Sequence, residues 1–214
     1  MPTIVCFGDS NTHGTRPMRD LNDAGRFDAA TRWPGRLATQ LGPETTIIEE
    51  GHPGRTTIND DPIEGVHKNG FVGLQIALET HRPIDLVIIM LGTNDLKARF
   101  SKTGLDIGIS AEKLLQLVAA SEAGPSKQPP KCLLVAPPPI LETGCLEEMF
   151  AGGAAKSQQF ARVYAEAASR QRQAFFDAGR VIASSPMEGI HFEADAHQML
   201  GDALASEVRS LLNL

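Results

Sequence analysis

Short apolar runs alternate along the chain with longer segments in which apolar residues recur at helical spacing. The runs are rich in Val, Ile and Leu, which is typical of strands buried on both faces of a parallel sheet. The pattern predicts strands at Thr3–Phe7, Thr45–Glu50, Asp85–Leu91, Lys131–Ala136 and Arg180–Ala183. It predicts helices at about Trp33–Leu41, Phe71–Thr80, Ile109–Ala120, Ala155–Ala178 and Asp195–Leu212.

This alternation of strands and helices indicates right-handed βαβ units and places the chain in the α/β class. The expected architecture is a three-layer α/β/α sandwich with a five-stranded parallel sheet. Five strands of this size favour a flavodoxin-like strand order, in which ligands bind outside the carboxyl ends of the strands. The chain has 214 residues and no internal repeat. We therefore expect a single domain that spans residues 1–214.

Two connections are longer than this fold requires. Asn11–Arg32 follows the first predicted strand and Gly51–Gly70 follows the second, whereas most such loops run roughly two to six residues. Both leave from carboxyl ends of strands, where ligands bind. They are interpreted as a lid, a pocket wall or a subunit contact; the alternative is a disordered surface insertion.

Composition and charge exclude several kinds of partner. The chain has 20 Lys and Arg against 26 Asp and Glu, a net charge of −6, which argues against a nucleic acid or an anionic membrane as its main partner. Its longest apolar stretch, Leu86–Leu91, is far shorter than the roughly 18 residues of a membrane-spanning helix. With 9 Phe, 1 Trp and 1 Tyr, it also lacks the aromatic residues of a platform that stacks bases or sugars.

The cysteines and the start of the chain suggest a compartment. Cys6, Cys132 and Cys145 are odd in number and form no Cys-x-x-Cys pair, which fits reduced thiols better than a disulfide framework. No secretory signal precedes the strand that starts at Thr3. We therefore expect a cytoplasmic protein.

A candidate nucleophile follows the first predicted strand, in Phe7-Gly8-Asp9-Ser10-Asn11. Ser10 would lie at the carboxyl edge of the sheet, in a turn that Gly8 permits and that Asp9 and Asn11 favour. Its backbone N–H would point outward near a helix start, where negative charge is stabilised. The alternative is a plain helix N-cap, which Gly-Asp-Ser commonly forms in such turns.

Two further turns could supply donors to an oxyanion. Asn94 lies in Leu91-Gly92-Thr93-Asn94-Asp95, directly after the third predicted strand, and can direct its amide into the same edge of the sheet. Gly54 follows the second strand and offers an unhindered backbone N–H. An Asx-turn at Asn94 and an ordinary turn at Gly54 are the alternatives.

Among six histidines, His191 is the best candidate for a general base, because it precedes the last predicted helix at the same edge of the sheet as Ser10. Glu188, three residues earlier, could accept the other ring N–H and fix the tautomer. His81 is expected to cap a helix, and His197 to be a surface or packing residue of the last helix. The remaining histidines, His13, His52 and His67, lie in the two long loops.

Neither metal nor phosphate chemistry has a matching motif. His and Asp cluster near His52, Asp60, Asp61 and His67, but no His-x-x-x-His, His-Glu-x-x-His or paired Cys-x-x-Cys spacing occurs. The segment Gly8–Gly14 matches neither the P-loop nor the dinucleotide-binding pattern. We expect no metal and no cofactor.

Taken together, these blocks resemble the SGNH hydrolases, the GDSL-type esterases and lipases, over essentially the whole chain. The likeness is closest to the intracellular arylesterase/acyltransferase branch. The blocks that carry it are Phe7-Gly8-Asp9-Ser10, Glu49-Glu50-Gly51, Arg55-Thr56-Thr57, Leu86 through Asp95 and Gly189-Ile190-His191-Phe192, with Gly54 between the second and third.

The resemblance assigns a role to each candidate. Ser10 would be the nucleophile and His191 the general base, while the Ser10 N–H, the Gly54 N–H and the Asn94 side chain would form the oxyanion hole. The family's acid, three residues before the histidine, is usually Asp, whereas this chain has Glu188 with one extra methylene. Some members use a backbone carbonyl instead, and Asp195 is a rival that reads better as a first-turn charge.

The expected function is a serine esterase that hydrolyses small acyl esters, such as aryl or alkyl acetates, through an acyl-serine intermediate. The resemblance adds acyltransferase or perhydrolase side activity. A carbohydrate acetyl esterase with the same triad is one alternative, and a non-catalytic ligand-binding scaffold is another. The expected partners are a small-molecule ester and copies of the chain itself, since the resemblance implies an octamer.

Overall fold

The computed structural model describes all residues, 1–214, and its five strands form one parallel sheet. The strands are β1 (Thr3–Gly8), β2 (Thr46–Gly51), β3 (Leu86–Met90), β4 (Lys131–Ala136) and β5 (Ala174–Asp177). Their order across the sheet is β2-β1-β3-β4-β5, and every neighbouring pair is parallel. This is the flavodoxin-like order that the pattern of strands and helices predicts.

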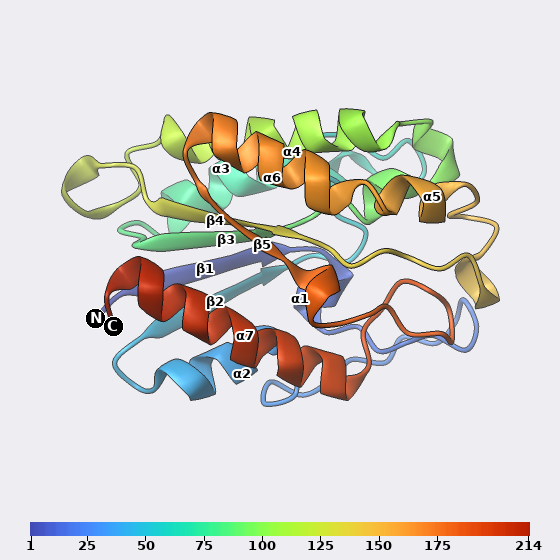
Figure 1. Cartoon of the computed structure of the whole chain (residues 1–214), viewed down its shortest axis with the longest axis horizontal. Helices are drawn as coiled ribbons and strands as arrows, with labels where there is room; N and C mark the ends of the chain where they lie inside the picture. The colour runs from blue at the N-terminus through green and yellow to red at the C-terminus, as the bar shows by residue number, and fades with distance from the viewer.

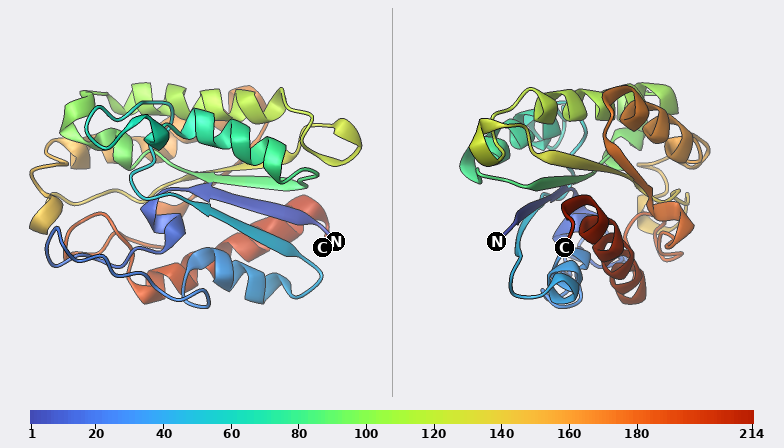
Figure 2. Two further views of the ribbon diagram at one scale, coloured as in Figure 1. Left: turned by 180° about the vertical axis from the view of Figure 1, so that it is seen from behind. Right: turned by 60° about the vertical axis from the view of Figure 1, so that its left-hand side comes forward.

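Helices cover both faces of this sheet, which confirms the three-layer α/β/α sandwich (Figures 1 and 2). One face carries α3 (Gly70–Thr80), α4 (Gly104–Ala119) and α6 (Phe160–Gln171), and the other carries α2 (Trp33–Leu41) and α7 (Ala194–Leu212). Two short helices, α1 (Ser10–His13) and α5 (Gly153–Ser157), lie in the loop regions. No helix is both long enough and apolar enough to cross a membrane.

The central strands are apolar after their first residue because each of their faces meets a helical layer. In β1, Val5 and Phe7 belong to the core beneath α3, α4 and α6, whereas Ile4 and Cys6 belong to the core beneath α2 and α7. Successive side chains of a strand point to opposite faces, and because both faces are buried here, the buried positions are apolar on both. The continuous apolar run in the sequence is therefore the signature of this three-layer packing.

The fifth strand is not where the sequence pattern places it. Arg180–Ala183 is not a strand: the backbone N–H groups of Val181 and Ile182 donate to the Ala178 carbonyl, as in a helical turn. The strand is Ala174–Asp177, inside a segment predicted to be helical. Phe175 packs toward the α4 side of the sheet and Phe176 toward the α7 side, so successive side chains alternate as in a strand.

Three predicted helices agree with the structure closely, and two need correction. Helix α4 begins at Gly104, five residues before the predicted start, because Thr103 and Asp106 form a reciprocal capping box there. The long predicted helix Ala155–Ala178 is divided into α5, α6 and β5. Helix α6 ends where Arg172 adopts a left-handed conformation with φ of 53°.

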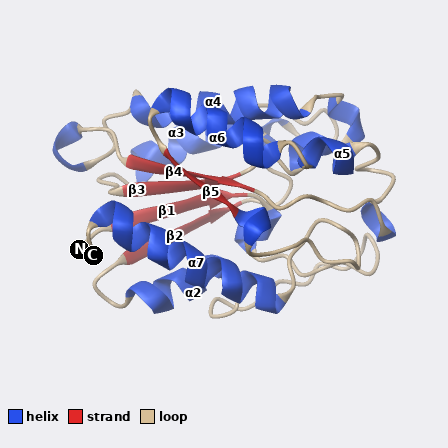
Figure 3. Cartoon of the chain, viewed as in Figure 1, coloured by secondary structure: helices blue, strands red, loops and turns tan.

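Long loops gather at the carboxyl end of the sheet, where all five parallel strands end (Figure 3). Ser10, Gly54 and Asn94 follow β1, β2 and β3, and His191 follows β5 by way of a loop that leads into α7. The topology therefore brings together candidate residues that are far apart in the sequence.

His197 of α7 is a buried packing residue, fully enclosed between the edges of Phe27 and Phe192. Its Nδ1 accepts a hydrogen bond from the Trp33 backbone N–H at 3.3 Å, so the ring is held neutral. Burial, together with the smaller effect of the nearby His191 and Arg32, lowers the pKa of His197 to about 4.

We expect this histidine to make the fold sensitive to acid. The unfolded chain binds a proton at His197 near pH 6.5 and the folded chain only near pH 4, so stability is lost as pH falls between these values. The difference corresponds to about 3 kcal/mol in the free energy of unfolding. Urea unfolding at pH 7 and pH 4 should show a smaller acid loss for His197→Gln than for the natural protein; an equal loss would contradict the assignment.

Candidate functional site

Ser10 begins the short helix α1 immediately after β1. The Asp9 carboxylate caps this helix by accepting the Asn11 backbone N–H at 2.9 Å, and the helix ends at Gly14 in a left-handed conformation. The Gly-Asp-Ser motif thus contains both a helix cap and a candidate nucleophile: Asp9 is the cap, and Ser10 is free to present its hydroxyl. Only 7% of Ser10 is exposed, at the carboxyl edge of the sheet.

The structure brings Ser10, His191 and Glu188 into one hydrogen-bonded chain. His191 Nε2 lies 3.0 Å from Ser10 Oγ, and His191 Nδ1 lies 2.8 Å from Glu188 Oε2. Both distances are within the range of a hydrogen bond. A hydroxyl, an imidazole and a carboxylate in this sequence can move a proton from the hydroxyl to the ring while the carboxylate fixes the ring's orientation.

The extra methylene of Glu188 is accommodated within the loop that carries His191. Glu188 is completely buried, and its Oε1 accepts the backbone N–H groups of His191 at 2.7 Å and Ile190 at 3.2 Å. The loop is also anchored from outside, because the Asn11 amide donates to the Ile190 carbonyl at 3.1 Å. Glu188 therefore holds both the backbone and the ring of His191.

Asp195 lies elsewhere and takes no part in this chain. Its carboxylate accepts the Ala196 backbone N–H at 2.8 Å in the first turn of α7, as expected for a first-turn charge. His81, at the C-cap of α3, pairs with Glu50 at 2.7 Å.

The Gly54 N–H is free to donate to a ligand, since no protein group accepts it. Gly54 has φ of 80°, a conformation that favours glycine, and its turn is fixed by Lys68, whose ammonium donates to the Pro53 carbonyl at 2.8 Å. The Ser10 N–H is likewise without an intrahelical acceptor, because Ser10 is the first residue of α1.

Asn94 completes this set of donors. Its amide Nδ2 donates to the Arg55 carbonyl at 3.1 Å and to Asp9 Oδ2 at 3.3 Å, which holds the amide at the mouth of the cavity beside Ser10. Asn94 follows Gly92, whose φ of 122° and close contact with the buried Tyr164 hydroxyl leave no room for a side chain.

Three buried polar side chains near the site were not singled out from the sequence. The Arg55 guanidinium stacks over the Phe7 ring, with 4.1 Å between the guanidinium carbon and the ring centroid, and donates to the carbonyls of Gly8, at 3.0 Å, and of Glu50. It thereby joins the ends of β1 and β2. Asp9 is the second of these side chains. Arg55 and Asp9 lie in the sequence motifs Arg-Thr-Thr and Gly-Asp-Ser, and these motifs are the signals that could have identified them.

Asp95 is the third of these side chains, and it joins the loops after β2 and β3. Its carboxylate accepts the Thr57 N–H at 2.8 Å, the Thr57 hydroxyl at 2.5 Å and the Asn59 amide at 2.7 Å. Burial raises the pKa of Asp95 above its ordinary value, although the bonds from Thr57 and the Lys102 charge oppose the rise. Burial likewise raises the pKa of Asp9 to about 6, against the hydrogen bond from Asn11 and the charges of His191 and Arg55.

A cavity of about 240 Å³ opens next to Ser10 and His191. Its lining includes six apolar side chains from the loops that precede α2, α5 and α7: Met18, Leu21, Leu146, Met149, Phe150 and Ile190. Polar side chains in the same lining include Thr15, Glu64 and Lys97. Residues of both long loops thus line the cavity, which agrees with the interpretation of these loops as a pocket wall.

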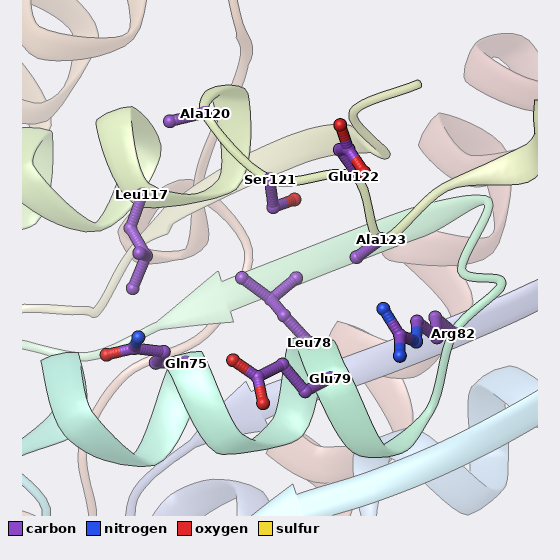
Figure 4. A pocket seen from close by; sticks show the side chains of 9 residues that line it. All are labelled: Gln75, Leu78, Glu79, Arg82, Leu117, Ala120, Ser121, Glu122 and Ala123. Carbon is purple, nitrogen blue, oxygen red and sulfur yellow. The ribbon is translucent and has the colours of Figure 1, made fainter. Parts of the chain in front are cut away.

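A second cavity, of about 300 Å³, lies between the carboxyl-terminal ends of α3 and α4 (Figure 4). Leu78 and Leu117 point into it, and Glu79, Arg82 and Glu122 surround it. It contains no histidine, and its one hydroxyl, that of Ser121, donates to the Val118 carbonyl at 2.8 Å, so it is not the candidate site. No group of three or more His, Cys, Asp or Glu side chains is arranged to hold a metal ion.

The histidines of the long loops lie apart from the Ser10–His191–Glu188 chain. The rings of His52 and His67 meet edge to face at 5.5 Å, and Lys68 Nζ lies 3.4 Å from His52 Nε2. Partial burial, together with the smaller effect of the Lys68 charge, lowers the pKa of His52 to about 4.

Comparisons with known proteins identify the family of this chain. The model of the GDSL-like lipase/acylhydrolase family matches residues 6–199. The aryl esterase of M. smegmatis is 45% identical, with a TM-score of 0.93 over 99% of this chain and 100% of that one. Est24, a carbohydrate acetylesterase from Sinorhizobium meliloti, is 39% identical, with the same TM-score over 99% of this chain and 100% of that one. No curated protein matches by sequence.

A more distant structure, the lipase/acylhydrolase from Enterococcus faecalis, is 20% identical and has a TM-score of 0.65 over 98% of this chain and 96% of that one, which shows the shared fold alone. The α/β sandwich and the family match define a hydrolase of the SGNH type. The chain belongs to the GDSL-like lipase/acylhydrolase family, and it is an esterase of the carboxylic-ester hydrolase class.

Proposed function

We propose that this esterase hydrolyses small acyl esters through an acyl-serine intermediate at Ser10. The observation that carries the proposal is the unbroken chain of hydrogen bonds from Ser10 through His191 to Glu188, at 3.0 and 2.8 Å, at the wall of a cavity. A non-catalytic ligand-binding scaffold would have no need for a hydroxyl, an imidazole and a buried carboxylate in this order.

In the first step, Ser10 Oγ attacks the ester carbonyl carbon while His191 Nε2 takes the hydroxyl proton. The C–O bond to the alcohol then breaks, and His191 returns the proton to the leaving oxygen. Water attacks the acyl-Ser10 ester with His191 again as the base, which releases the acid and restores the serine. Glu188 holds the imidazole and stabilises its charged form throughout.

The developing oxyanion would be held by the N–H groups of Ser10 and Gly54 and by the Asn94 amide. The longer of the two Asn94 bonds, 3.3 Å to Asp9, is the one that a bound oxyanion would share. Removing one donor of this kind typically costs on the order of 3 kcal/mol in the barrier, or about a hundredfold in rate. If another alcohol or a peroxide replaces water in the second step, the same site transfers the acyl group.

The size and lining of the cavity favour a short acyl chain. A space of about 240 Å³ with apolar side chains in its lining suits an acetate or a similar group on an aryl or alkyl alcohol. The M. smegmatis relative, an aryl esterase, supports this choice. A carbohydrate acetylesterase is the second candidate, supported by Est24 and by the polar lining residues Thr15, Glu64 and Lys97.

The proposal is tested by incubating the purified protein with a fluorophosphonate and with 4-nitrophenyl acetate. We expect release of 4-nitrophenol and covalent labelling of Ser10, found by mass spectrometry of the digested protein, because the inhibitor phosphonylates an activated serine. Prior labelling should abolish hydrolysis. Hydrolysis without labelling, or a label on another serine, would assign the chemistry elsewhere.

We also propose that the esterase works in the cytoplasm as a homo-oligomer. Three free thiols, of Cys6, Cys132 and Cys145, support a reducing compartment. Exposed apolar side chains support association: Val72 and Ile76 lie one turn apart on α3, and Ile63 and Val66 lie in the loop before it.

A further inference from the structure

Four charged side chains pair with one another at the edge of the cavity: Asp61 and Glu64 of the loop after β2, and Lys97 and Arg99 after β3. We call them the charged cluster. Glu64 and Lys97 line the cavity together with Ser10 and Gly54. Their charges sum to zero, so the cluster does not oppose a developing oxyanion with a net negative charge.

The backbone of Glu64 is held in place by Asp61. Asp61 Oδ1 accepts the backbone N–H groups of Ile63 and Glu64, both at 2.9 Å, and the side chain of Asp61 is completely buried. Asp61 Oδ2 accepts Arg99 at 2.8 Å. The turn that presents Glu64 is therefore fixed from within.

The carboxylate of Glu64 is held equally firmly, but through one oxygen only. Glu64 Oε1 accepts the Lys97 ammonium and, at 2.5 Å, the Arg99 guanidinium. The Lys97 side chain is only 4% exposed, so its bond to Glu64 is not readily replaced by water. No protein group donates to Glu64 Oε2, although about a third of the Glu64 side chain remains exposed.

This free oxygen lies next to the candidate oxyanion donor. A Cβ atom added to Gly54 would be only 2.4 Å from Glu64 Oε2, so the oxygen sits directly against the turn that carries the Gly54 N–H. A carboxylate oxygen is an acceptor only. Its complement in a substrate bound at Ser10 is a hydroxyl close to the ester group, and such a hydroxyl belongs to the alcohol of a diol, polyol or sugar ester.

We propose that Glu64 is a specificity-determining residue that selects esters whose alcohol carries a second hydroxyl, by accepting that hydroxyl on Oε2. The inference rests on the proposed acyl-serine function of the same site. Lys97 and Arg99 are positioning residues that hold the other oxygen of the carboxylate. A rigid acceptor of this kind discriminates against substrates that lack the donor, because the bound ester displaces water from the carboxylate oxygen and then leaves it unpaired.

The test compares two acetates that differ in one donor, 2-hydroxyethyl acetate and 2-methoxyethyl acetate. We expect kcat/KM of the natural protein to be about tenfold higher for the hydroxyl ester. In Glu64→Gln, the amide carbonyl should take the place beside Lys97 and Arg99 and turn the NH₂ group toward the substrate. The acceptor becomes a donor, and the ratio of the two kcat/KM values should fall to about two or less.

Glu147→Gln is the matched control, because Glu147 is exposed next to the cavity residue Leu146 but does not line the cavity. This variant removes the same charge and should keep the natural ratio. Should Glu64→Gln fail to fold, Glu64→Asp serves instead, because the shorter side chain cannot reach both its cations and the substrate, and the ratio should fall there too.

The outcomes separate the two proposals. A protein that hydrolyses neither ester nor 4-nitrophenyl acetate would overturn the proposed function itself. Hydrolysis with equal kcat/KM for the two esters, or a natural ratio retained in Glu64→Gln, would overturn the role of Glu64 and leave the acyl-serine chemistry standing.

Discussion

Ser10→Ala and His191→Ala are each expected to lower kcat for 4-nitrophenyl acetate by a factor on the order of 10⁴ to 10⁶. Ser10→Ala removes the attacking oxygen, and His191→Ala leaves the Ser10 hydroxyl without the base that lies 3.0 Å away. The residual rate would come from the oxyanion donors and from binding alone. Steady-state kinetics with the purified variants measure the loss.

The double variant gives a sharper result than either single change. Because the two side chains act as one unit, Ser10→Ala/His191→Ala should be no slower than Ser10→Ala alone. Losses that multiply instead would mean that the two residues contribute independently, which contradicts proton transfer between them.

Controls for folding are available within the chain. Ser184→Ala replaces a buried serine whose hydroxyl donates to the Pro139 carbonyl, and His81→Ala replaces a histidine outside the cavity. Both variants should retain nearly full activity. All four single variants should keep cooperative thermal unfolding, so that a lost rate reports chemistry and not structure. Unchanged rates in Ser10→Ala and His191→Ala would exclude the proposed nucleophile and base.

Much of the fold follows from patterns that are local in the sequence. Leu86–Met90 is apolar at every position because both faces of β3 meet helices, so its apolar run identifies a central strand without further information. A local apolar run does not identify β5. Phe175 and Phe176 alone are too short a signal to stand out from the flanking helical pattern, and pairing with β4 decides their conformation.

The site residues likewise fall into those that the sequence could predict and those that it could not. Ser10, Gly54, Asn94 and His191 follow strands or precede a helix at one edge of a parallel sheet, so topology alone predicts that they converge. The charged cluster could not be predicted in this way. Glu64 and Lys97 belong to different loops and to no motif, and their pairing depends on how residues 51–70 fold over the cavity.

Glu188 is the residue at which the sequence and the structure together give the most specific expectation. It replaces the usual Asp, yet its two oxygens divide two tasks: Oε2 binds the His191 ring at 2.8 Å, and Oε1 holds the backbone N–H groups of His191 and Ile190. We expect Glu188→Ala to lower kcat by about 10² to 10³, with a smaller change in KM, because the imidazole loses its orientation and its counter-charge. The loss should remain smaller than that of His191→Ala.

Two conservative variants separate orientation from charge at this position. Glu188→Gln keeps the length but supplies only one acceptor oxygen, so either the backbone or the ring loses its partner, and kcat should fall nearly as far as in Glu188→Ala. Glu188→Asp keeps both oxygens and the charge three residues before His191, where the family usually has Asp. It should stay within about tenfold of the natural enzyme, because a small shift of the loop restores the bond to the ring. Full activity in Glu188→Ala would mean that another group orients His191. A folded Glu188→Asp as slow as Glu188→Ala would mean that the longer side chain is indispensable to this loop.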